Sequence, residues 1–172
     1  MKKAFQLKAI AGFVVALLIS TVAMAQDSPR DSVSGKVHGA TISINYGAPS
    51  VRGRKIYGGL QPYGKMWRAG ANAATTFKTD KDIMVEGKKL AAGTYTLFVT
   101  PGEKEFVVTF NSQLGQWGIK RNGDANEDPA KDAAVVTVKP KTVDATERLK
   151  YVITKAGFEL VWATTSIPVS IK

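Results

Sequence analysis

The sequence contains no cysteine and only one histidine, His38. Without cysteine, no disulfide stabilises the fold, and a lipid anchor of the lipoprotein type is excluded. One histidine alone cannot build a zinc site from the usual nitrogen and sulfur ligands. A Ser-His-Asp triad would have to use His38, which precedes Gly39 in a predicted turn, and no serine-elbow motif is present. We therefore predict no metal site, no cofactor and no catalytic histidine.

Motifs for phosphate, nucleic-acid and calcium binding are missing or incomplete. The chain has no phosphate-binding loop and no recognised nucleic-acid-binding motif, so we predict no nucleic-acid partner. Asp124, Asn126 and Asp128 alternate as in the first half of a calcium-binding loop. However, Pro129 stands where that loop needs glycine, and Val135 where it needs a bidentate glutamate. We interpret this segment as a solvated polar loop.

Long apolar runs are absent except at the N-terminus. There, residues 9–24 (AIAGFVVALLISTVAM) follow a basic start and end in the small residues of an A-x-A cleavage site. We predict a signal peptide over 1–25 and a single exported domain over 26–172, soluble in the periplasm or secreted; an uncleaved N-terminal anchor is the alternative. No later run approaches the roughly 20 apolar residues that a membrane-spanning helix needs, so no membrane span is predicted.

Acidic residues are absent from position 32 to position 79, whereas seven lysine and arginine residues fall in the same stretch. Removal of the three lysines of the signal peptide lowers the formal net charge from +10 to +7, so the domain remains basic. A stretch of one charge sign favours attraction to anionic partners. It also means that paired catalytic carboxylates would have to come from the later part of the chain.

Helical periodicity is weak throughout, apart from one possible turn at 128–132. Short runs rich in β-branched and aromatic residues alternate instead with turn signals such as Pro101-Gly102 and Lys155-Ala156-Gly157. This texture predicts an all-β fold: one antiparallel β-sandwich, jelly-roll or immunoglobulin-like, with about 8–10 short strands. The predicted strands are 41–46, 75–79, two within 82–90, 94–100, 105–111, 133–140, 148–154, 158–164 and 167–172.

Two long segments, residues 47–74 and 112–132, lack the runs of β-branched and aromatic residues that are typical of strands. Both are longer than the usual connection in a compact domain, and structureless loops of this length are uncommon unless they have a function or are mobile. The first is rich in glycine and proline and contains the centre of the acid-free stretch. We therefore look for a functional site there.

The motif PYGKMWRAGANAAT, residues 62–75, has the composition of a binding site. Its arginine offers a planar fork of donors that matches carboxylate, sulfate or phosphate groups. Its glycines allow the backbone to approach a ligand closely. We predict a site formed by this motif and VRGRK at 51–55. The predicted site residues are Arg68 as the main charge partner, Arg52, Arg54 and Lys65 as auxiliary cations, Asn72 and Thr75 as hydrogen-bonding groups, and Tyr63 and Trp67 as stacking groups.

The same segments resemble a known family. YGAPSVRGRKIYGGLQPYGKMWRAGANAAT at 46–75 and GKKLAAGTYTLFVTPGEKEFVVTFN at 87–111 are similar to exported bacterial proteins catalogued as domain of unknown function 2911. The resemblance spans essentially the whole mature chain and implies an exported β-domain without an assigned activity. Similar sequences commonly carry glutamate where this chain has Ala73. If that glutamate were a base or a metal ligand, this chain would have lost it, which weakens an enzymatic interpretation.

We therefore predict non-catalytic binding of an anionic or polar small molecule, or of an envelope glycan, at the 51–76 region. The first alternative is a structural or protein-interaction module of the cell envelope, in which Trp67 closes one end of the sandwich, Arg68 caps backbone carbonyls and Asn72 holds a turn. The second is a hydrolase or isomerase whose base lies in the later half. The sequence leaves the oligomeric state and the identity of the ligand open.

Overall fold

The computed structural model describes residues 28–172, and the predicted signal peptide and its cleavage site lie outside these residues. In the described part the chain forms ten β-strands and one short 3-10 helix. The strands are β1 (Arg30–Val37), β2 (Ala40–Gly47), β3 (Thr76–Thr79), β4 (Ile83–Val85), β5 (Lys88–Leu90), β6 (Gly93–Thr100), β7 (Phe106–Asn111), β8 (Asp132–Val138), β9 (Lys141–Thr154) and β10 (Gly157–Ser170), and the helix is η1 (Pro129–Lys131).

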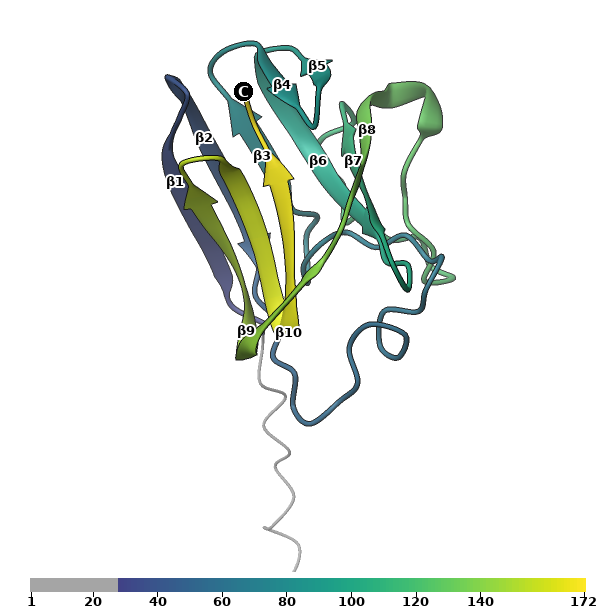
Figure 1. The fold of residues 1–172 in the computed structure, drawn as a ribbon. Coiled ribbons are helices and arrows are strands. Elements are labelled where there is room, and N and C mark those ends of the chain that lie inside the picture. The colour runs from purple at the N-terminus through teal and green to yellow at the C-terminus, as the bar shows by residue number, and fades with distance from the viewer. Residues whose placement is uncertain (1–27) are drawn as a thin grey trace, which may run out of the picture.

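Six strands form one antiparallel sheet in the order β1-β2-β3-β6-β7-β8. The order follows the chain, with the small β4–β5 hairpin inserted between β3 and β6 (Figure 1). Buried and exposed residues alternate in β2: Ile42 and Ile44 are fully buried, whereas Thr41, Ser43 and Asn45 are partly or fully exposed. One face of this sheet therefore needs a cover.

A long hairpin of β9 and β10 covers that face (Figure 1). Phe158 and Trp162 of β10 are fully buried against it, and Phe158 lies 5.5 Å from the ring of Phe77 in β3. The two layers enclose one apolar core, the arrangement of an antiparallel β-sandwich. Within residues 28–172, no helix is both long and apolar enough to cross a membrane.

The all-β fold and the antiparallel sandwich are confirmed, and so are the hairpins at 82–90 and around Pro101-Gly102. Two details differ. Strand β1 was not predicted, because RDSVSGKV has little apolar alternation and becomes a strand by pairing with β2. The two runs predicted at 158–164 and 167–172 are one strand, because Thr165 and Ser166, at the predicted break, pair with Thr142 and Lys141 of β9; a bulge lies nearby, at Ala163 with φ 52°.

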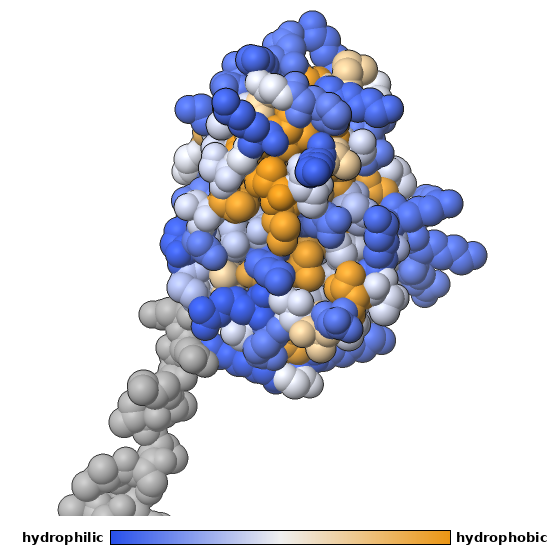
Figure 2. Space-filling model, turned by 60° about the vertical axis from the view of Figure 1, so that its left-hand side comes forward, coloured by the Kyte–Doolittle hydropathy of each residue, from blue (hydrophilic) through white to orange (hydrophobic). Residues whose placement is uncertain are grey.

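Strands β1 and β9 lie along one side of the sandwich, where the two layers meet. The two strands belong to different sheets and form no ladder with each other. Figure 2 shows a strip of apolar side chains running down this side. A shallow hollow here is lined by Val33, Gly35 and Ile153, and a Cβ on Gly35 would lie only 2.9 Å from Ile153 Cγ2. Gly35 thus allows the two edges to approach closely.

The long segment between β2 and β3 gathers at one end of the sandwich, opposite the end that carries the β4–β5 hairpin and the C-terminus (Figure 1). Trp67 pairs with Val99 of β6 through two backbone hydrogen bonds of 2.9 Å, and Ser50 forms a bridge with Arg148 of β9. The segment is therefore tied to both layers, and it closes this end of the core.

Candidate functional site

The backbone of the 62–75 motif lies directly on the end of β2. The Ala71 N–H donates to the carbonyl of Gly47 over 3.1 Å, and a Cβ on Gly47 would fall only 1.9 Å from Ala71 O. Gly70 also has little room, because its Cβ would lie 2.6 Å from Thr75 Oγ1. These two glycines permit a close backbone contact that no other residue allows without movement.

Three non-glycine residues of this end adopt a left-handed backbone: Arg52 (φ 51°), Ala69 (φ 50°) and Asn72 (φ 62°). Asparagine tolerates this conformation, but alanine and arginine pay a steric cost for it. The Ala69 carbonyl holds the strained turn in place, since it accepts from the hydroxyls of Thr75 (3.0 Å) and Tyr151 (2.8 Å). Strain maintained by buried bonds is common at functional sites.

Two adjoining hollows, of about 370 Å³ and 260 Å³, form what we call the basic groove. They share Leu60, Gln61, Arg68 and Gly70, so the groove is continuous across Arg68. The first hollow is also lined by Pro62, Lys65, Met66, Trp67, Ile119, Asn122, Gly123 and Asp124. The second is also lined by Ser28, Pro49, Ser50, Arg52, Arg54, Ala71 and Trp162.

Arg68 stands in the middle of the groove and is partly buried. Its Nη1 donates to the carbonyl of Trp117 over 3.1 Å, the one acceptor that this guanidinium has among the described residues. Its Cζ lies 5.3 Å from the centre of the Trp117 ring, a cation–π distance. Burial lowers the pKa of Arg68 from its ordinary value, because desolvation disfavours the charged form. An anion placed here would favour the charged form of Arg68 and so offset the cost of desolvation.

The floor of the groove contains two indole N–H groups without an acceptor. Trp67 is 5% exposed and Trp162 is 0% exposed, and their rings pack 5.8 Å apart at an angle of 31°. Neither Nε1 has a hydrogen-bond partner among the described residues, and the nearby Tyr57 hydroxyl has none either. A buried donor left unpaired costs about 1–3 kcal/mol. The three groups form one cluster, since the Tyr57 ring lies 6.4 Å from that of Trp162.

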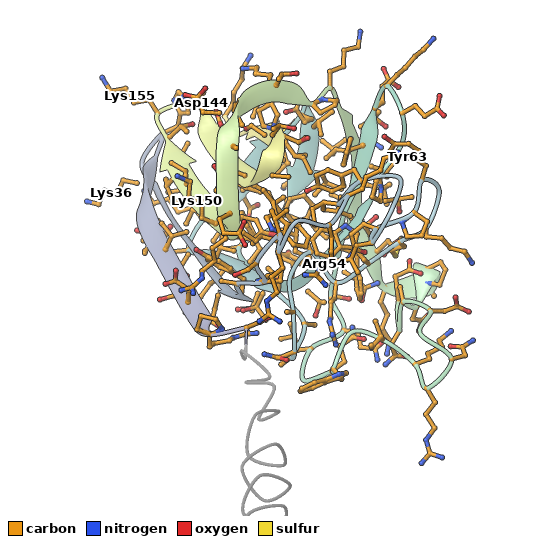
Figure 3. All side chains as sticks on the ribbon, turned by 90° about the horizontal axis from the view of Figure 1, so that it is seen from below. Lys36, Arg54, Tyr63, Asp144, Lys150 and Lys155 are labelled. Carbon is orange, nitrogen blue, oxygen red and sulfur yellow. The ribbon has the colours of Figure 1, made fainter. Side chains whose placement is uncertain are left out.

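The other predicted cations lie at the two ends of the groove. Arg54 donates through Nε to Val51 O (3.0 Å) and through Nη2 to Ser50 O (2.6 Å), and Figure 3 shows it under the middle of this end of the sandwich. Arg52 lines the same hollow, and its backbone N–H donates to Glu147 Oε1 over 2.9 Å. Lys65, at the opposite end, is exposed and lies 3.7 Å from Asp124.

The basic stretch converges only in part. Asp124 is the single carboxylate among the described residues that line the groove, and it faces Lys65 at one end, so Arg68 keeps no acidic partner. Lys36 lies in β1, and Figure 3 shows it on the β1 side of the molecule, away from Arg54. The basic character of the groove thus rests on its arginines.

The three remaining predicted residues do not line the groove. Thr75 is fully buried and bonds the Ala69 carbonyl. Asn72 donates through Nδ2 to Ser28 O over 2.8 Å and so fastens the N-terminal end of the described chain. Tyr63 is 43% exposed and lies against Gly58, and Figure 3 shows it near the edge of the molecule. The structure gives these residues framework positions.

The N-terminal end is fastened to the motif at further points. The Ala48 N–H donates to Pro29 O over 2.8 Å. The Arg30 guanidinium donates to Ala73 O (2.8 Å), to Ala74 O (3.3 Å) and to Asn45, in both its side chain and its backbone. Arg30 thus has a structural role, with four hydrogen bonds from its five N–H donors.

Sequence reasoning missed two tryptophans, Trp117 and Trp162. Trp162 comes from β10, about a hundred residues after the motif, and no local pattern connects the two. Trp117 belongs to the second long loop, which folds against the motif: Ala74 N–H donates to Gln116 O over 3.3 Å, and a Cβ on Gly118 would lie 2.7 Å from Arg68 Cβ. The signal that the sequence offered was the length of this loop, because structureless loops of such length are uncommon unless they have a function or are mobile.

The second loop ends in a hydrogen-bonded carboxyl pair. Asn111 is fully buried and donates through Nδ2 to Asp132 Oδ1 and to Asp128 O, each over 2.8 Å. Glu127 hydrogen-bonds Asp132. Desolvation raises the pKa of Glu127 to about 7, and the bond to Asp132 and the charges of Asp132 and Asp128 contribute to the rise. The charge of Lys120 opposes it. The pair therefore holds a proton at mildly acidic pH.

This proton makes stability depend on pH. Between an unfolded pKa of 4.5 and a folded pKa of about 7, folded Glu127 keeps a proton that the unfolded chain releases, so the free energy of unfolding falls as pH rises through that window. Glu127→Gln, which keeps a donor for Asp132, is expected to remove this fall and to be more stable than the wild type at pH 8. Urea denaturation at pH 4.5, 6 and 8 checks this; parallel pH profiles for the two proteins would contradict it.

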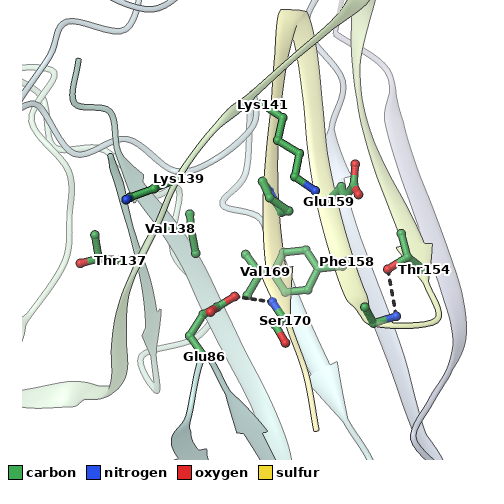
Figure 4. A pocket seen from close by; sticks show the side chains of 12 residues that line it. Glu86, Thr137, Val138, Lys139, Lys141, Thr154, Phe158, Glu159, Val169 and Ser170 are labelled. Carbon is green, nitrogen blue, oxygen red and sulfur yellow. Dashed lines mark hydrogen bonds between the residues drawn. The ribbon is translucent and has the colours of Figure 1, made fainter. Parts of the chain in front are cut away.

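Another hollow, of about 470 Å³, lies between β8 and β10 (Figure 4). It combines Lys139 and Lys141 with Glu86 and Glu159, so its charges are mixed. Glu86 accepts from the Ser170 N–H, and Glu159 accepts from Ser166 Oγ over 2.7 Å. Because both carboxylates have protein partners and no buried donor here lacks one among residues 28–172, the basic groove is the better candidate.

Fold and groove together define a class: an antiparallel β-sandwich with a basic, tryptophan-floored groove at one end. The chain belongs to the family described as protein of unknown function (DUF2911), whose profile matches residues 28–171. The match covers the whole described sandwich, including both loops that form the groove. Searches of curated proteins and of solved structures returned no match.

Proposed function

We propose that the protein is a non-catalytic binding protein for an anionic, oxygen-rich ligand that occupies the basic groove. The observation that carries the proposal is the combination of a partly buried arginine without a carboxylate and two buried indole N–H groups without acceptors. Arg68 supplies a charge-assisted bond to the anion. Trp67 and Trp162 supply neutral donors from the floor of the groove.

The chemistry of the lining favours binding over catalysis. The groove contains one carboxylate, Asp124, which is exposed and faces Lys65. A general base needs a group held within hydrogen-bond reach of the substrate proton and tuned by its surroundings. Glu127, whose pKa is raised, does not line either hollow. The groove is built of donors, as suits recognition of a ligand rich in acceptors.

Substitution of Arg68 by methionine tests the proposal. Methionine keeps much of the length of the side chain but removes the charge and all five donors. We expect the affinity for glucuronate or inorganic phosphate, measured by isothermal titration calorimetry, to fall at least tenfold. Stability should change by about 1 kcal/mol, since only one carbonyl bond and one ring contact are lost.

Lys78→Met is the matched control. Lys78 is an exposed cation in β3 and does not line the groove, so its loss changes the net charge equally and should leave the affinity intact. Equal titrations for the wild type and Arg68→Met would refute the proposal. They would leave the sandwich as a structural or interaction module of the cell envelope.

A further inference from the structure

A separate hollow of about 470 Å³ adjoins the groove on the far side of Arg68. Trp117 forms part of its lining, and Arg68, which packs on the Trp117 ring, belongs to the lining of the groove. The contact between these two side chains thus separates the hollows. A ligand longer than one ring that starts in the groove reaches the second hollow by passing over this contact.

Trp117 is placed as an exposed platform. Trp117 is 56% exposed, the highest exposed fraction among the large apolar residues described. Its backbone is nevertheless fixed, because its carbonyl accepts from Arg68 and the next residue, Gly118 (φ 89°), packs so tightly that a Cβ there would lie 2.7 Å from Arg68 Cβ. A large indole exposed to solvent on a fixed backbone is suited to stacking the apolar face of a ring.

The neighbouring Gln116 adds an acceptor without a donor. Its Oε1 is buried and has no partner among the described residues, whereas its Nε2 donates to Gln113 O over 3.2 Å, which determines the orientation of the amide. Arg30 is the one charged residue among the described residues that line this hollow, and four of its five N–H donors bond Asn45, Ala73 and Ala74. The hollow therefore suits a neutral ring that donates a hydroxyl.

We propose that this hollow is a second subsite and that the ligand is an acidic glycan: a sugar bearing a carboxylate binds in the basic groove, and the neighbouring neutral sugar stacks on Trp117 and donates a hydroxyl to Gln116. The inference rests on the proposed function of the groove. It goes further in assigning the ligand at least two sugar rings and in giving each ring its own residues. The order of the two rings follows the charges. On one side of the Arg68–Trp117 contact, Arg68 has no acidic partner among the described residues. On the other side, the one charged residue of the described lining is Arg30, which already donates to Asn45, Ala73 and Ala74.

The test compares glucuronic acid with an aldobiuronic acid in which glucuronic acid is linked to a neutral sugar. The second ring is expected to raise the affinity about tenfold. Trp117→Ala and Gln116→Met should each remove most of this gain. Affinity for free glucuronic acid should survive in Gln116→Met, because Arg68, Trp67, Trp117 and Trp162 remain; Trp117→Ala also removes the ring that packs on Arg68, so it is judged by whether the disaccharide loses more affinity than glucuronic acid does. Gln116→Met is the stricter variant, since Gln116 makes no side-chain contact with Arg68.

The three tryptophans of the chain also provide a direct readout. In spectra of ¹⁵N-indole-labelled protein, glucuronic acid should shift the N–H signals of Trp67 and Trp162, and the disaccharide should shift that of Trp117 as well. If glucuronic acid binds but the second sugar adds no affinity, the inference fails and the proposed function stands. If Trp117→Ala weakens both ligands equally, the ring only supports Arg68 and the inference also fails. If neither ligand binds the wild type, both proposals fail.

Discussion

Replacement of Gly47 by alanine is expected to destabilise the fold by about 3 kcal/mol, because the new methyl group meets backbone that has no room to yield. The Cβ would lie 1.9 Å from Ala71 O and 2.7 Å from Ala71 C. Both atoms belong to a loop held against β2 by the hydrogen bond from Ala71 N–H to Gly47 O. Relief of the clash therefore requires the motif to leave the sheet, which breaks that bond and strains the bonds to the Ala69 carbonyl. Urea denaturation measures the loss.

Gly64→Ala is the control for this variant. Gly64 belongs to the same motif but has no atom within 4 Å of its hypothetical Cβ, and only its left-handed φ of 74° opposes a side chain. Its replacement should cost about 1 kcal/mol. The affinity for anions should fall in Gly47→Ala and persist in Gly64→Ala, since only the first displaces the wall of the groove. Similar losses of stability in both variants would show that the contact between Gly47 and Ala71 is not the determinant.

The second large effect is expected at Trp162. Trp162→Ala should cost about 3–5 kcal/mol, because it empties the centre of an aromatic cluster that contains Trp67 and Tyr57. Trp162→Phe should cost far less. Phenylalanine keeps most of the ring contacts and removes an N–H that has no acceptor among the described residues, so part of the lost packing is offset by relief of an unpaired buried donor.

A pair of measurements separates packing from hydrogen bonding at this position. If Trp162→Phe loses as much stability as Trp162→Ala, the indole N–H has a partner, such as a bound water, and the floor of the groove offers a ligand one donor fewer. If Trp162→Phe is nearly as stable as the wild type yet binds glucuronate several-fold more weakly, the donor serves the ligand rather than the fold. Guanidinium denaturation and calorimetric titration of the same samples give both answers.

The structure shows which features a sequence alone could reveal. The hairpins at 82–90 and at 94–111 were predictable, because a turn pair and two short alternating runs lie next to one another in the chain. Strand β1 was not, because its residues are mostly exposed and its pairing with β2 decides its conformation. The break predicted between 164 and 167 is wrong for a related reason: Thr165 and Ser166 pair with β9 and so continue β10.

The groove was predictable in part. Charge composition pointed to Arg68, Arg54 and Arg52, and these residues do line it. The roles of Trp117 and Trp162 depend on contacts across 49 and 95 residues of chain, which periodicity and motifs do not encode. Thr75 shows the opposite error: a polar residue in a promising motif whose hydroxyl is taken by a backbone carbonyl inside the fold. Composition identifies the groups available, whereas only the fold decides which of them remain unpaired.

The attachment of Ser28, Pro29 and Arg30 to the motif has a practical consequence for anyone handling the protein. Ser28 lines one hollow of the groove, so a purification tag or a surface linker joined just before it would emerge beside the groove. The C-terminal Lys172 leaves the sandwich at the opposite end, next to β4 (Figure 1). Sensor chips, affinity resins and fluorescent labels are therefore best coupled through the C-terminus, where they leave the entrance clear.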